Sequence, residues 1–147
     1  MRGIKTNGRV EIRNPGSTRP WQHVLDPLLG YLITLEYQLS GGQIDALNFG
    51  PKEESLSVES VIRVIEMEWP DCVPFDYPRV ESSYPALESK TLDLDSKKAE
   101  QILGWEPTWT QELAVKSTVN WWKDVLSQKV SESEACLRDI QALKLIN

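Results

Sequence analysis

The sequence predicts an α/β fold that is richer in helix than in strand. Apolar residues recur with a helical period in five segments, whereas only three short stretches have the pattern of strands. The chain has 147 residues, of which 40% are hydrophobic and six are tryptophan. That length suffices for one domain with a real core, but not for two large domains.

The first two elements are a short strand and a long helix. Residues 9–13 alternate apolar and polar side chains, which predicts a strand. Apolar residues then follow a helical period up to the sequence "SGG" at 40–42, where glycine can adopt a left-handed C-cap conformation. Proline is tolerated only in a first turn, so Pro27 places the start of this helix near Leu25 or Asp26.

The central region predicts a strand, a helix and a loop. Residues 44–50 form a compact apolar run that ends in glycine, which we interpret as a buried strand. Ser57 is placed to cap an amphipathic helix over 58–69, and Pro70 stops that helix. Residues 70–90 contain four prolines and no clear period, which indicates a long loop.

The last third is predicted to be mainly helical. A short strand over 91–95 ends in Asp95, which can cap a helix that Gly104 terminates. A polar gap separates the longest helix, about 110–128, from a short tail helix that begins near Ala135. The long helix is predicted to bury one broad face, made by Leu113, Ala114, Thr118, Trp121, Trp122 and Val125.

Charge and composition exclude several classes of function. The net charge of −6 argues against a general binder of nucleic acid or of anionic membranes. Cys72 and Cys136 are far apart and form no CxxC pair, so we expect reduced, buried thiols in preference to a disulfide or a metal site. No apolar run reaches 18 residues and the N-terminus lacks the apolar core of a signal peptide, which predicts a cytoplasmic protein.

The common catalytic and cofactor motifs are missing from the sequence. It contains no GxGxxG, no GxxxxGK[ST] and no HExxH, and His23 is its only histidine. Most of its carboxylates lie in runs such as "KEES" and "SESE", which are typical of solvated helix faces.

The stretch "RNPGSTRPWQHVLDP" is the strongest candidate for a binding site. Arg19 lies between threonine and proline, so its backbone is stiff and its guanidinium could be aimed. A planar, permanently charged guanidinium suits bidentate contact with phosphate oxygens, and Trp21 could hold it by stacking. In the alternative interpretation, Arg19 pairs with a surface carboxylate and Trp21 fills the core.

Four segments together resemble a known enzyme family. They are "IRNPGSTRPWQHVLDPLLGYL", "NFGP", "LDLDSKKAEQILGWEPTW" and "TVNWW", and they occur in the order and spacing seen in CDP-glucose 4,6-dehydratases. Those are nucleotide-sugar enzymes of the extended short-chain dehydrogenase/reductase family. The resemblance covers about residues 9 to 125; its RPWQHV block is fairly specific, and its LGW-P block is shared more widely among sugar-nucleotide epimerases and dehydratases.

The resemblance implies three substrate-binding residues. Arg19 matches the arginine that reaches the diphosphate of the sugar nucleotide, and Ser57 matches a position near the phosphates, where a helix N-terminus suits an anion. Glu88 matches the acidic residue of the family's "HEAH" stretch. Leu87 and Lys90 replace the two histidines of that stretch, so this part of the pocket departs from the family pattern.

The resemblance also implies a domain organisation. Residues 1–130 correspond to the C-terminal substrate-binding portion of a Rossmann-type enzyme, with its last helix and strand at about 23–50, and residues 131–147 form a tail helix. Asp95 is then a helix cap rather than a catalyst, and Trp105 and Trp109 are expected in the core.

The family's glycine-rich NAD-binding loop and its catalytic Tyr-x-x-x-Lys pair are not found in the sequence. Glu88 stands four residues after Tyr84, and neither Tyr31 nor Tyr37 has a lysine at that spacing. We therefore expect no catalytic residue and no cofactor site in this chain, although NAD is implied for a full-length relative. Three readings stay open: an inactive nucleotide-sugar-binding part, a non-catalytic interaction module, and a truncated remnant without selected activity.

The expected partners are a nucleotide-diphosphate sugar and a second polypeptide. The helix over 26–39 would lack the parallel sheet that it packs on in relatives. An apolar patch would then be exposed, made by Leu25, Leu28, Leu29, Leu32 and Ile33. We expect either a homo-oligomer or a partner that supplies the missing Rossmann half, and no nucleic acid or membrane.

Overall fold

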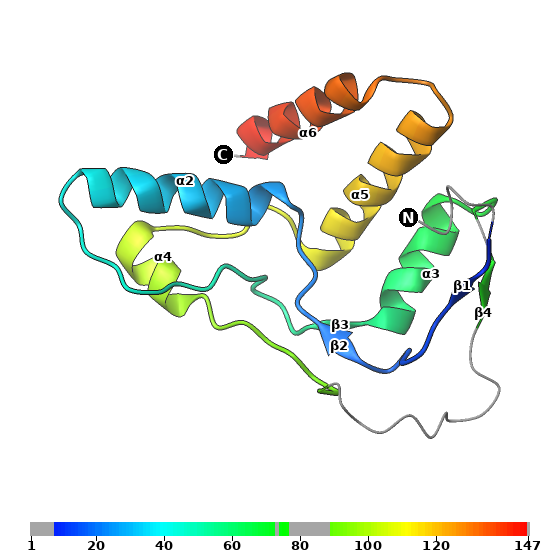
Figure 1. Ribbon diagram of the computed structural model, residues 1–147, viewed down its shortest axis with the longest axis horizontal. Helices are drawn as coiled ribbons and strands as arrows, with labels where there is room; N and C mark the ends of the chain where they lie inside the picture. Colours follow the sequence, from blue (N-terminus) through cyan, green and yellow to red (C-terminus); the bar gives the residue numbers. More distant parts are fainter. Residues whose placement is uncertain (1–7, 73, 77–88, 147) are drawn as a thin grey trace.

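The computed structural model describes residues 8–72, 74–76 and 89–146, and shows a helical protein with very short strands (Figure 1). The helices are α2 (Leu25–Leu39), α3 (Val58–Glu68), α4 (Lys97–Leu103), α5 (Gln111–Leu126) and α6 (Glu132–Ile146). The strands are β1 (Val10–Glu11), β2 (Thr18–Arg19), β3 (Leu56–Ser57) and β4 (Phe75–Asp76). A helix-rich α/β composition is therefore confirmed.

The strands form two separate pairs. β1 runs parallel to β4, with Val10 opposite Phe75. β2 runs antiparallel to β3, with Thr18 opposite Ser57. Because each pair has two residues per strand, the strands serve to fix loops against helices rather than to form a core layer.

The apolar core is divided into two clusters. One lies between α3 and α5, which pack on each other, and consists of Val61, Val64, Val115 and Val119 with Trp21, Leu56, Ile65 and Trp69 against it. The other lies between α2 and α4 and consists of Phe49, Ala99 and Trp105, with Ile33, Leu47 and Leu103 against it. Figure 1 shows these two helix pairs at opposite ends of the molecule, with α5 and α6 along the upper side.

Several predicted helix boundaries are confirmed. α2 begins at Leu25, with Pro27 in its first turn, and ends before Gly41, whose φ is +92°. The hydroxyl of Ser57 accepts a hydrogen bond from the Ser60 amide, which makes it the N-cap of α3. Gly104 ends α4 in the left-handed conformation, with φ of +63°.

In the last third, one further prediction is confirmed and one is corrected. An Asp95 carboxylate oxygen accepts a hydrogen bond from the Lys97 amide at 3.0 Å. However, the N-cap of α4 is Ser96, which makes no side-chain capping bond, so Asp95 lies one residue before the predicted position. Trp105 and Trp109 are 2% and 6% exposed, so both belong to the core.

The predicted strand over 44–50 is wrong. The segment is extended but joins no sheet among the described residues, and it lies instead across α2 and α4. Leu47 and Phe49 pack into the cluster between those helices. Only Phe49 and Gly50 of the segment are buried, so the apolar run predicted burial correctly at its end alone. A strand also requires a second strand with which its backbone can pair.

One other strand prediction and one loop prediction need correction. The stretch 91–95 makes only a single bridge, between Thr91 and Thr18, because β2 is too short to pair with more of it. The predicted loop over 70–90 contains β4, whose partner β1 lies more than sixty residues earlier in the chain and left no local signal. Residues 77–88 lie outside the described part.

The predicted buried face of α5 is rotated from the observed one. Leu113 is 51% exposed, whereas Gln111, Val115 and Val119 are buried together with Ala114. Since α3 packs along only one side of α5, that contact selects which of the apolar residues are covered. The tail helix α6 begins at Glu132, three residues before its first apolar residue.

The two cysteines are free thiols, as expected, but neither is buried. Cys72 is partly exposed and Cys136 is exposed. Among the described helices, none combines the length and the apolar character that crossing a bilayer requires.

Candidate functional site

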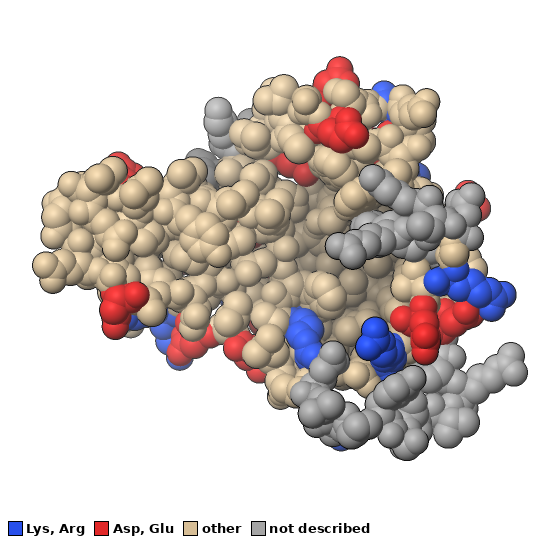
Figure 2. Space-filling view, in the orientation of Figure 1, with Lys and Arg blue, Asp and Glu red and all other residues tan. Residues whose placement is uncertain are grey.

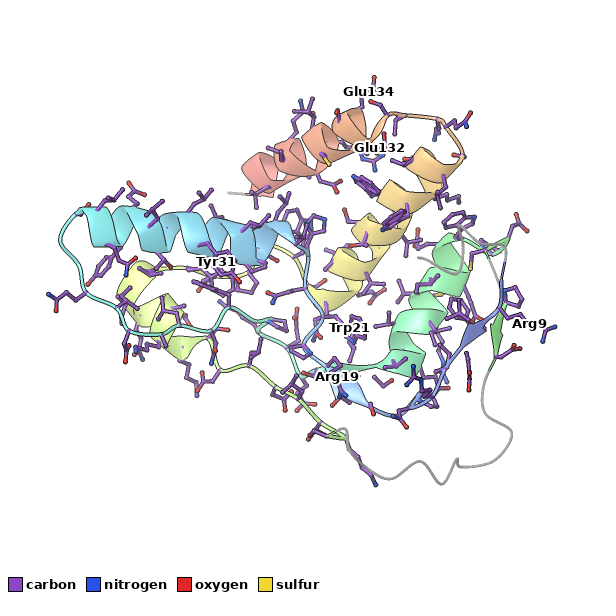
Figure 3. All side chains as sticks on the ribbon, in the orientation of Figure 1. Arg9, Arg19, Trp21, Tyr31, Glu132 and Glu134 are labelled. Carbon is purple, nitrogen blue, oxygen red and sulfur yellow. The ribbon has the colours of Figure 1, made fainter. Side chains whose placement is uncertain are left out.

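The candidate binding turn lies between the two core clusters. Figure 3 shows Arg19 at β2 and Trp21 above it, toward the space between α3 and α5. The backbone amide of Trp21 donates to the Gln111 side-chain oxygen at 3.1 Å. Its indole N–H donates to the Leu56 carbonyl at 3.0 Å, and its ring packs on the cluster of α3 and α5. This packing supports the alternative in which Trp21 fills the core.

Gln111 is the residue that holds this turn, and the sequence analysis missed it. It is 2% exposed at the start of α5, and its side-chain oxygen accepts from the amides of both Trp21 and Leu56. Its side-chain nitrogen donates to the Glu54 carbonyl at 2.7 Å. Gln111 thus connects the residue that follows β2 closely, Trp21, with the segment that leads into β3. A glutamine at the start of a helix gives no sequence signal for this role, because its partners lie far away in the chain.

Arg19 is half-buried on β2. One of its guanidinium nitrogens, Nη1, donates to the Thr18 carbonyl at 2.7 Å, so the side chain folds back along its own strand. A guanidinium has five N–H donors in one plane, which is the geometry that a diphosphate can accept.

Ser57 lies close to Arg19 in the sheet but does not face it. Thr18 is the residue directly opposite Ser57, and Arg19 is opposite Leu56. Side chains of directly paired residues share a face and neighbours along a strand alternate, so Arg19 and Ser57 leave the sheet on opposite faces. The Ser57 hydroxyl also contacts the Ser60 hydroxyl at 2.9 Å, in addition to capping α3.

The first turn of α3 is already supplied with acceptors by the protein itself. The Val58 amide donates to the Ser17 carbonyl and the Glu59 amide donates to the Pro15 carbonyl, both at 2.9 Å. The Ser60 amide donates to Ser57. The proline-rich turn before β2 therefore wraps the N-terminus of α3, where the sequence analysis expected an anion. Any phosphate near this helix would have to be held by side chains.

The third predicted site residue, Glu88, lies outside the described residues, as does Leu87. Lys90 is exposed, and its carbonyl accepts a hydrogen bond from the Thr18 amide at 2.9 Å. The end of the "HEAH"-like stretch is therefore attached to the same strand that carries Arg19. The structure thus places Arg19, Ser57 and the backbone of Lys90 in one neighbourhood.

The only histidine in the sequence is packed into the protein interior. His23 is 2% exposed, its ring lies 4.3 Å from that of Trp109, and its Nδ1 accepts from the Leu25 amide. Because Nδ1 is an acceptor, a neutral ring carries its proton on Nε2, which lies 3.4 Å from a carboxylate oxygen of Asp139. His23 therefore connects the candidate turn to α6.

Asp26 is a second buried polar residue next to the turn. It is 0% exposed, and one carboxylate oxygen accepts from the Thr108 amide at 2.7 Å. Its other oxygen has no hydrogen-bond partner in the described part of the chain. Burial raises the pKa of this carboxyl above its ordinary value of 3.8, and the bonds from Thr108 offset only part of that effect.

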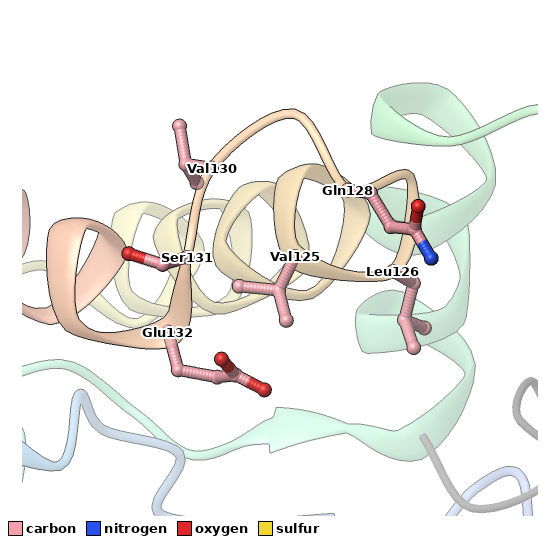
Figure 4. A pocket seen from close by; sticks show the side chains of 6 residues that line it. All are labelled: Val125, Leu126, Gln128, Val130, Ser131 and Glu132. Atoms are coloured by element: carbon pink, nitrogen blue, oxygen red, sulfur yellow. The ribbon is translucent and has the colours of Figure 1, made fainter.

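Two surface hollows lie away from Arg19. One, of about 460 Å³, is formed by the connection between α5 and α6 (Figure 4), and among the described residues Glu132 is its one charged lining residue. Ser131, which also lines it, donates its hydroxyl to Glu134 at 2.8 Å in the first turn of α6. The other, of about 480 Å³, lies beside α4, and its charged lining residues balance, with Lys52 and Lys97 against Asp95 and Glu100. Lys52 forms an ion pair with Glu106 at 2.7 Å.

The residues present do not fit an NAD site. In the described part, the parallel pair β1–β4 has two residues in each strand, and no glycine-rich turn connects a strand to a helix. A dinucleotide's pyrophosphate needs such a turn at a helix N-terminus. No catalytic step through NAD is therefore derived for this chain.

Comparison with known proteins decides the family. No family model matches the chain. The CDP-glucose 4,6-dehydratase of Salmonella typhimurium is 34% identical to it over 126 residues, which are 84% of this chain and 34% of that enzyme. A UDP-glucose 4-epimerase of Rhizobium meliloti is 31% identical over 120 residues, or 81% of this chain and 35% of that enzyme.

Solved structures agree on the fold. A UDP-glucuronic acid 4-epimerase from Bacillus cereus superposes with a TM-score of 0.64 at 19% identity, over 84% of this chain and 38% of that one. A dTDP-glucose 4,6-dehydratase from Bacillus anthracis gives a TM-score of 0.57 at 17% identity, over 79% and 34%. The chain belongs to the NAD-dependent epimerase/dehydratase family. It spans about a third of the length of the curated relatives that it matches.

In this chain Gln111 holds the segment that carries Arg19 and Trp21, and Asp26 ties the start of α2 to Thr108. The fold is that of part of a Rossmann-type epimerase or dehydratase.

Proposed function

We propose that the chain is the nucleotide-sugar-binding part of a 4,6-dehydratase-like protein, with CDP-glucose as its ligand. The observation that carries this proposal is the 34% identity to a CDP-glucose 4,6-dehydratase, together with the position of Arg19 on the turn held by Gln111. By itself the chain binds the nucleotide sugar without turning it over.

Arg19 supplies the central contact in this proposal. Its guanidinium, which donates to the Thr18 carbonyl at 2.7 Å, forms a bidentate contact with the diphosphate when the ligand is bound. Ser57 shapes the site by capping α3, because its hydroxyl and the first amides of that helix already have partners. Glu88, which lies outside the described residues, is the third residue that the resemblance assigns to the site.

Isothermal titration calorimetry with CDP-glucose tests the proposal. A charge-assisted bidentate contact contributes on the order of 1.5–3 kcal/mol, so Arg19→Ala should weaken binding by roughly tenfold or more. Arg63→Ala is the matched control, because Arg63 is an exposed arginine of α3 that pairs with Glu59 at 2.7 Å. It should leave the affinity unchanged.

Two results would contradict the proposal. Equal affinities of the wild type and Arg19→Ala would return Arg19 to the role of a surface residue. No heat of binding with CDP-glucose, CDP or UDP-glucose at millimolar concentration would remove nucleotide-sugar binding by this chain.

The alternative is a non-catalytic interaction module derived from such an enzyme. The observation that favours it is the exposed apolar side of α2 described next. A truncated remnant without selected activity would show neither ligand binding nor specific association.

A further inference from the structure

α2 exposes a continuous apolar stripe. Six large side chains on one side of this helix are between 45% and 80% exposed: Val24, Leu28, Tyr31, Leu32, Leu35 and Leu39. In Figure 2 the part of the molecule that contains α2, at left, shows a broad area without charged side chains. We refer to these six residues as the α2 stripe.

The stripe differs from the patch predicted from the sequence. Leu28 and Leu32 belong to both, but Leu25, Leu29 and Ile33 are partly buried, and Ile33 packs against the cluster of Phe49 and Trp105. The contact with α4 thus fixes which side of α2 is left open. The stripe lies on the side away from that cluster, except that Tyr31 lies at its border, where its ring meets that of Phe49 edge to face with 5.6 Å between centroids (Figure 3).

Charge does not interrupt the stripe. α2 contains only two charged residues, Asp26 and Glu36, and Asp26 is fully buried. The helix carries no lysine or arginine that could cover the stripe with its aliphatic stem. Soluble monomers rarely expose large contiguous apolar patches without using them.

The spacing of the stripe is the same in both directions along the helix. Reversing the order of its positions places Val24 on Leu39, Leu28 on Leu35 and Tyr31 on Leu32. A two-fold symmetric interface needs this property, since residue i of one copy contacts residue j of the other and the reverse. The steps between Val24, Leu28, Tyr31 and Leu35 are four, three and four residues, the spacing of helix pairs that interlock side by side.

We propose that α2 of one copy pairs antiparallel with α2 of a second copy through this stripe. In that arrangement Glu36 lies level with Pro27 in the first turn of the partner helix, where the helix dipole favours a negative charge. A parallel pair would bring the two Glu36 side chains and like helix ends together. This inference goes beyond nucleotide-sugar binding and does not depend on it.

The first test measures the size of the chain by sedimentation velocity over a dilution series. The wild type should be a dimer that dissociates on dilution. Leu32→Glu places a charge beside Tyr31 of the partner at the centre of the pair, so it should raise the dimer dissociation constant by at least roughly thirtyfold, as at an interface hot spot.

The matched control is Met67→Glu on α3. Met67 is 67% exposed and Leu32 is 65% exposed, so the two substitutions place the same charge at equally open apolar positions. Met67→Glu should leave the dissociation constant unchanged. Circular dichroism of both variants checks that the fold is kept.

Disulfide trapping tests the orientation of the helices. In a background with Cys72→Ser and Cys136→Ser, a mixture of Leu28→Cys and Leu35→Cys chains should form mixed disulfides under mild oxidation. Leu39→Cys alone should not cross-link, because the two copies of residue 39 lie at opposite ends of an antiparallel pair.

Any of four results would overturn the proposal. They are a monomer at every concentration, a dimer insensitive to Leu32→Glu, efficient cross-linking of Leu39→Cys to itself, and a chain that stays monomeric but uses the stripe to bind the NAD-binding portion of a dehydratase. Since no measurement involves a nucleotide, failure here is distinguishable from failure of CDP-glucose binding.

Discussion

Buried polar side chains decide the geometry around the candidate turn. Gln111 makes hydrogen bonds to four backbone groups of the described residues, from two separate segments, and its side chain has almost no contact with solvent. A buried side-chain amide whose oxygen and nitrogen are both hydrogen-bonded stabilises one arrangement of the chain, because any other arrangement would leave buried polar groups unpaired. Arg19 is therefore presented on a turn whose backbone is fixed from outside that turn.

Asp26 illustrates the opposite case, because its hydrogen bonds offset only part of the free-energy cost of burying its carboxyl group. One of its oxygens has no partner in the described part of the chain, and desolvation raises the pKa of the carboxyl. A raised folded-state pKa means that the folded state binds the proton more tightly than the unfolded state. The contribution of Asp26 to the free energy of unfolding is therefore greatest at low pH and is lost as pH rises through the folded pKa.

Asp26→Asn should remove this dependence and keep the bond from Thr108. Relative to the wild type, the variant should gain stability as pH rises above 3.8, the ordinary pKa of aspartate. Urea unfolding at several values between pH 4 and pH 7 measures the difference. A difference that is constant over this range would show that the carboxyl titrates alike in both states.

Asp124→Asn is the control, because Asp124 has the opposite shift. Arg138 lies 2.5 Å from one of its carboxylate oxygens and lowers the pKa of that carboxyl. Its stabilising effect is present above the ordinary pKa and is lost as pH falls through the folded one. Relative to the wild type, Asp124→Asn should therefore be less stable by a nearly constant amount between pH 4 and pH 7, the range in which the difference for Asp26→Asn changes, and should lose this disadvantage only below pH 3.8.

At the scale of elements, close packing between α2 and the 44–50 segment positions the stripe. A methyl group added at Gly30 would lie 2.5 Å from ring atoms of Phe49. The ring of Phe49 in turn meets Trp105 edge to face, with 4.9 Å between ring centroids. Gly30 lets the helix approach this pair of aromatic rings.

Gly30→Ala should therefore destabilise the fold, although alanine is the better helix former. Alanine gains about 1 kcal/mol in helix propensity, but the overlap with Phe49 should cost more, for a net loss of about 1–3 kcal/mol. Gly16→Ala is the control, since nothing lies within 4 Å of a methyl group there. Thermal unfolding measures both variants. An unchanged or higher melting temperature for Gly30→Ala would mean that Phe49 can move aside without loss.

α6 is attached to the rest of the molecule through few contacts. It packs on α5, with Ala135 buried, and the ion pair of Arg138 with Asp124 crosses between the two helices. Asp139 reaches His23 next to the candidate turn. The tail helix therefore supports the segment that leads from Arg19 into α2.

At the scale of the whole molecule, the sequence contains neither the Tyr-x-x-x-Lys pair nor the glycine-rich NAD-binding loop of the family. Tyr84 is followed four residues later by Glu88 instead of a lysine. The described residues include no strand, glycine-rich turn and helix that could bind NAD. We expect no conversion of CDP-glucose to the 4-keto-6-deoxy sugar by the purified chain with added NAD. Product formation at roughly 1 s⁻¹ or faster, in the range of ordinary enzymes, would contradict this expectation.

The sequence alone determined the helices, their caps and the family. Ser57, Gly104 and Pro27 act through bonds within one or two turns, so local chemistry predicts them correctly. The order of the motifs around Arg19 was likewise sufficient to indicate sugar-nucleotide enzymes, as the 34% identity to a dehydratase bears out.

Only the tertiary structure decided which strands form and which surfaces are open. The 44–50 run has the composition of a strand, but among the described residues no strand pairs with it, and side chains of Gln22 and Ser96 bond its backbone instead. β4 forms because β1 is brought to it. Gln111 and His23 obtain their roles from partners more than fifty residues away. Pairing and burial of this kind depend on contacts between distant segments, and such contacts leave no periodicity in the sequence.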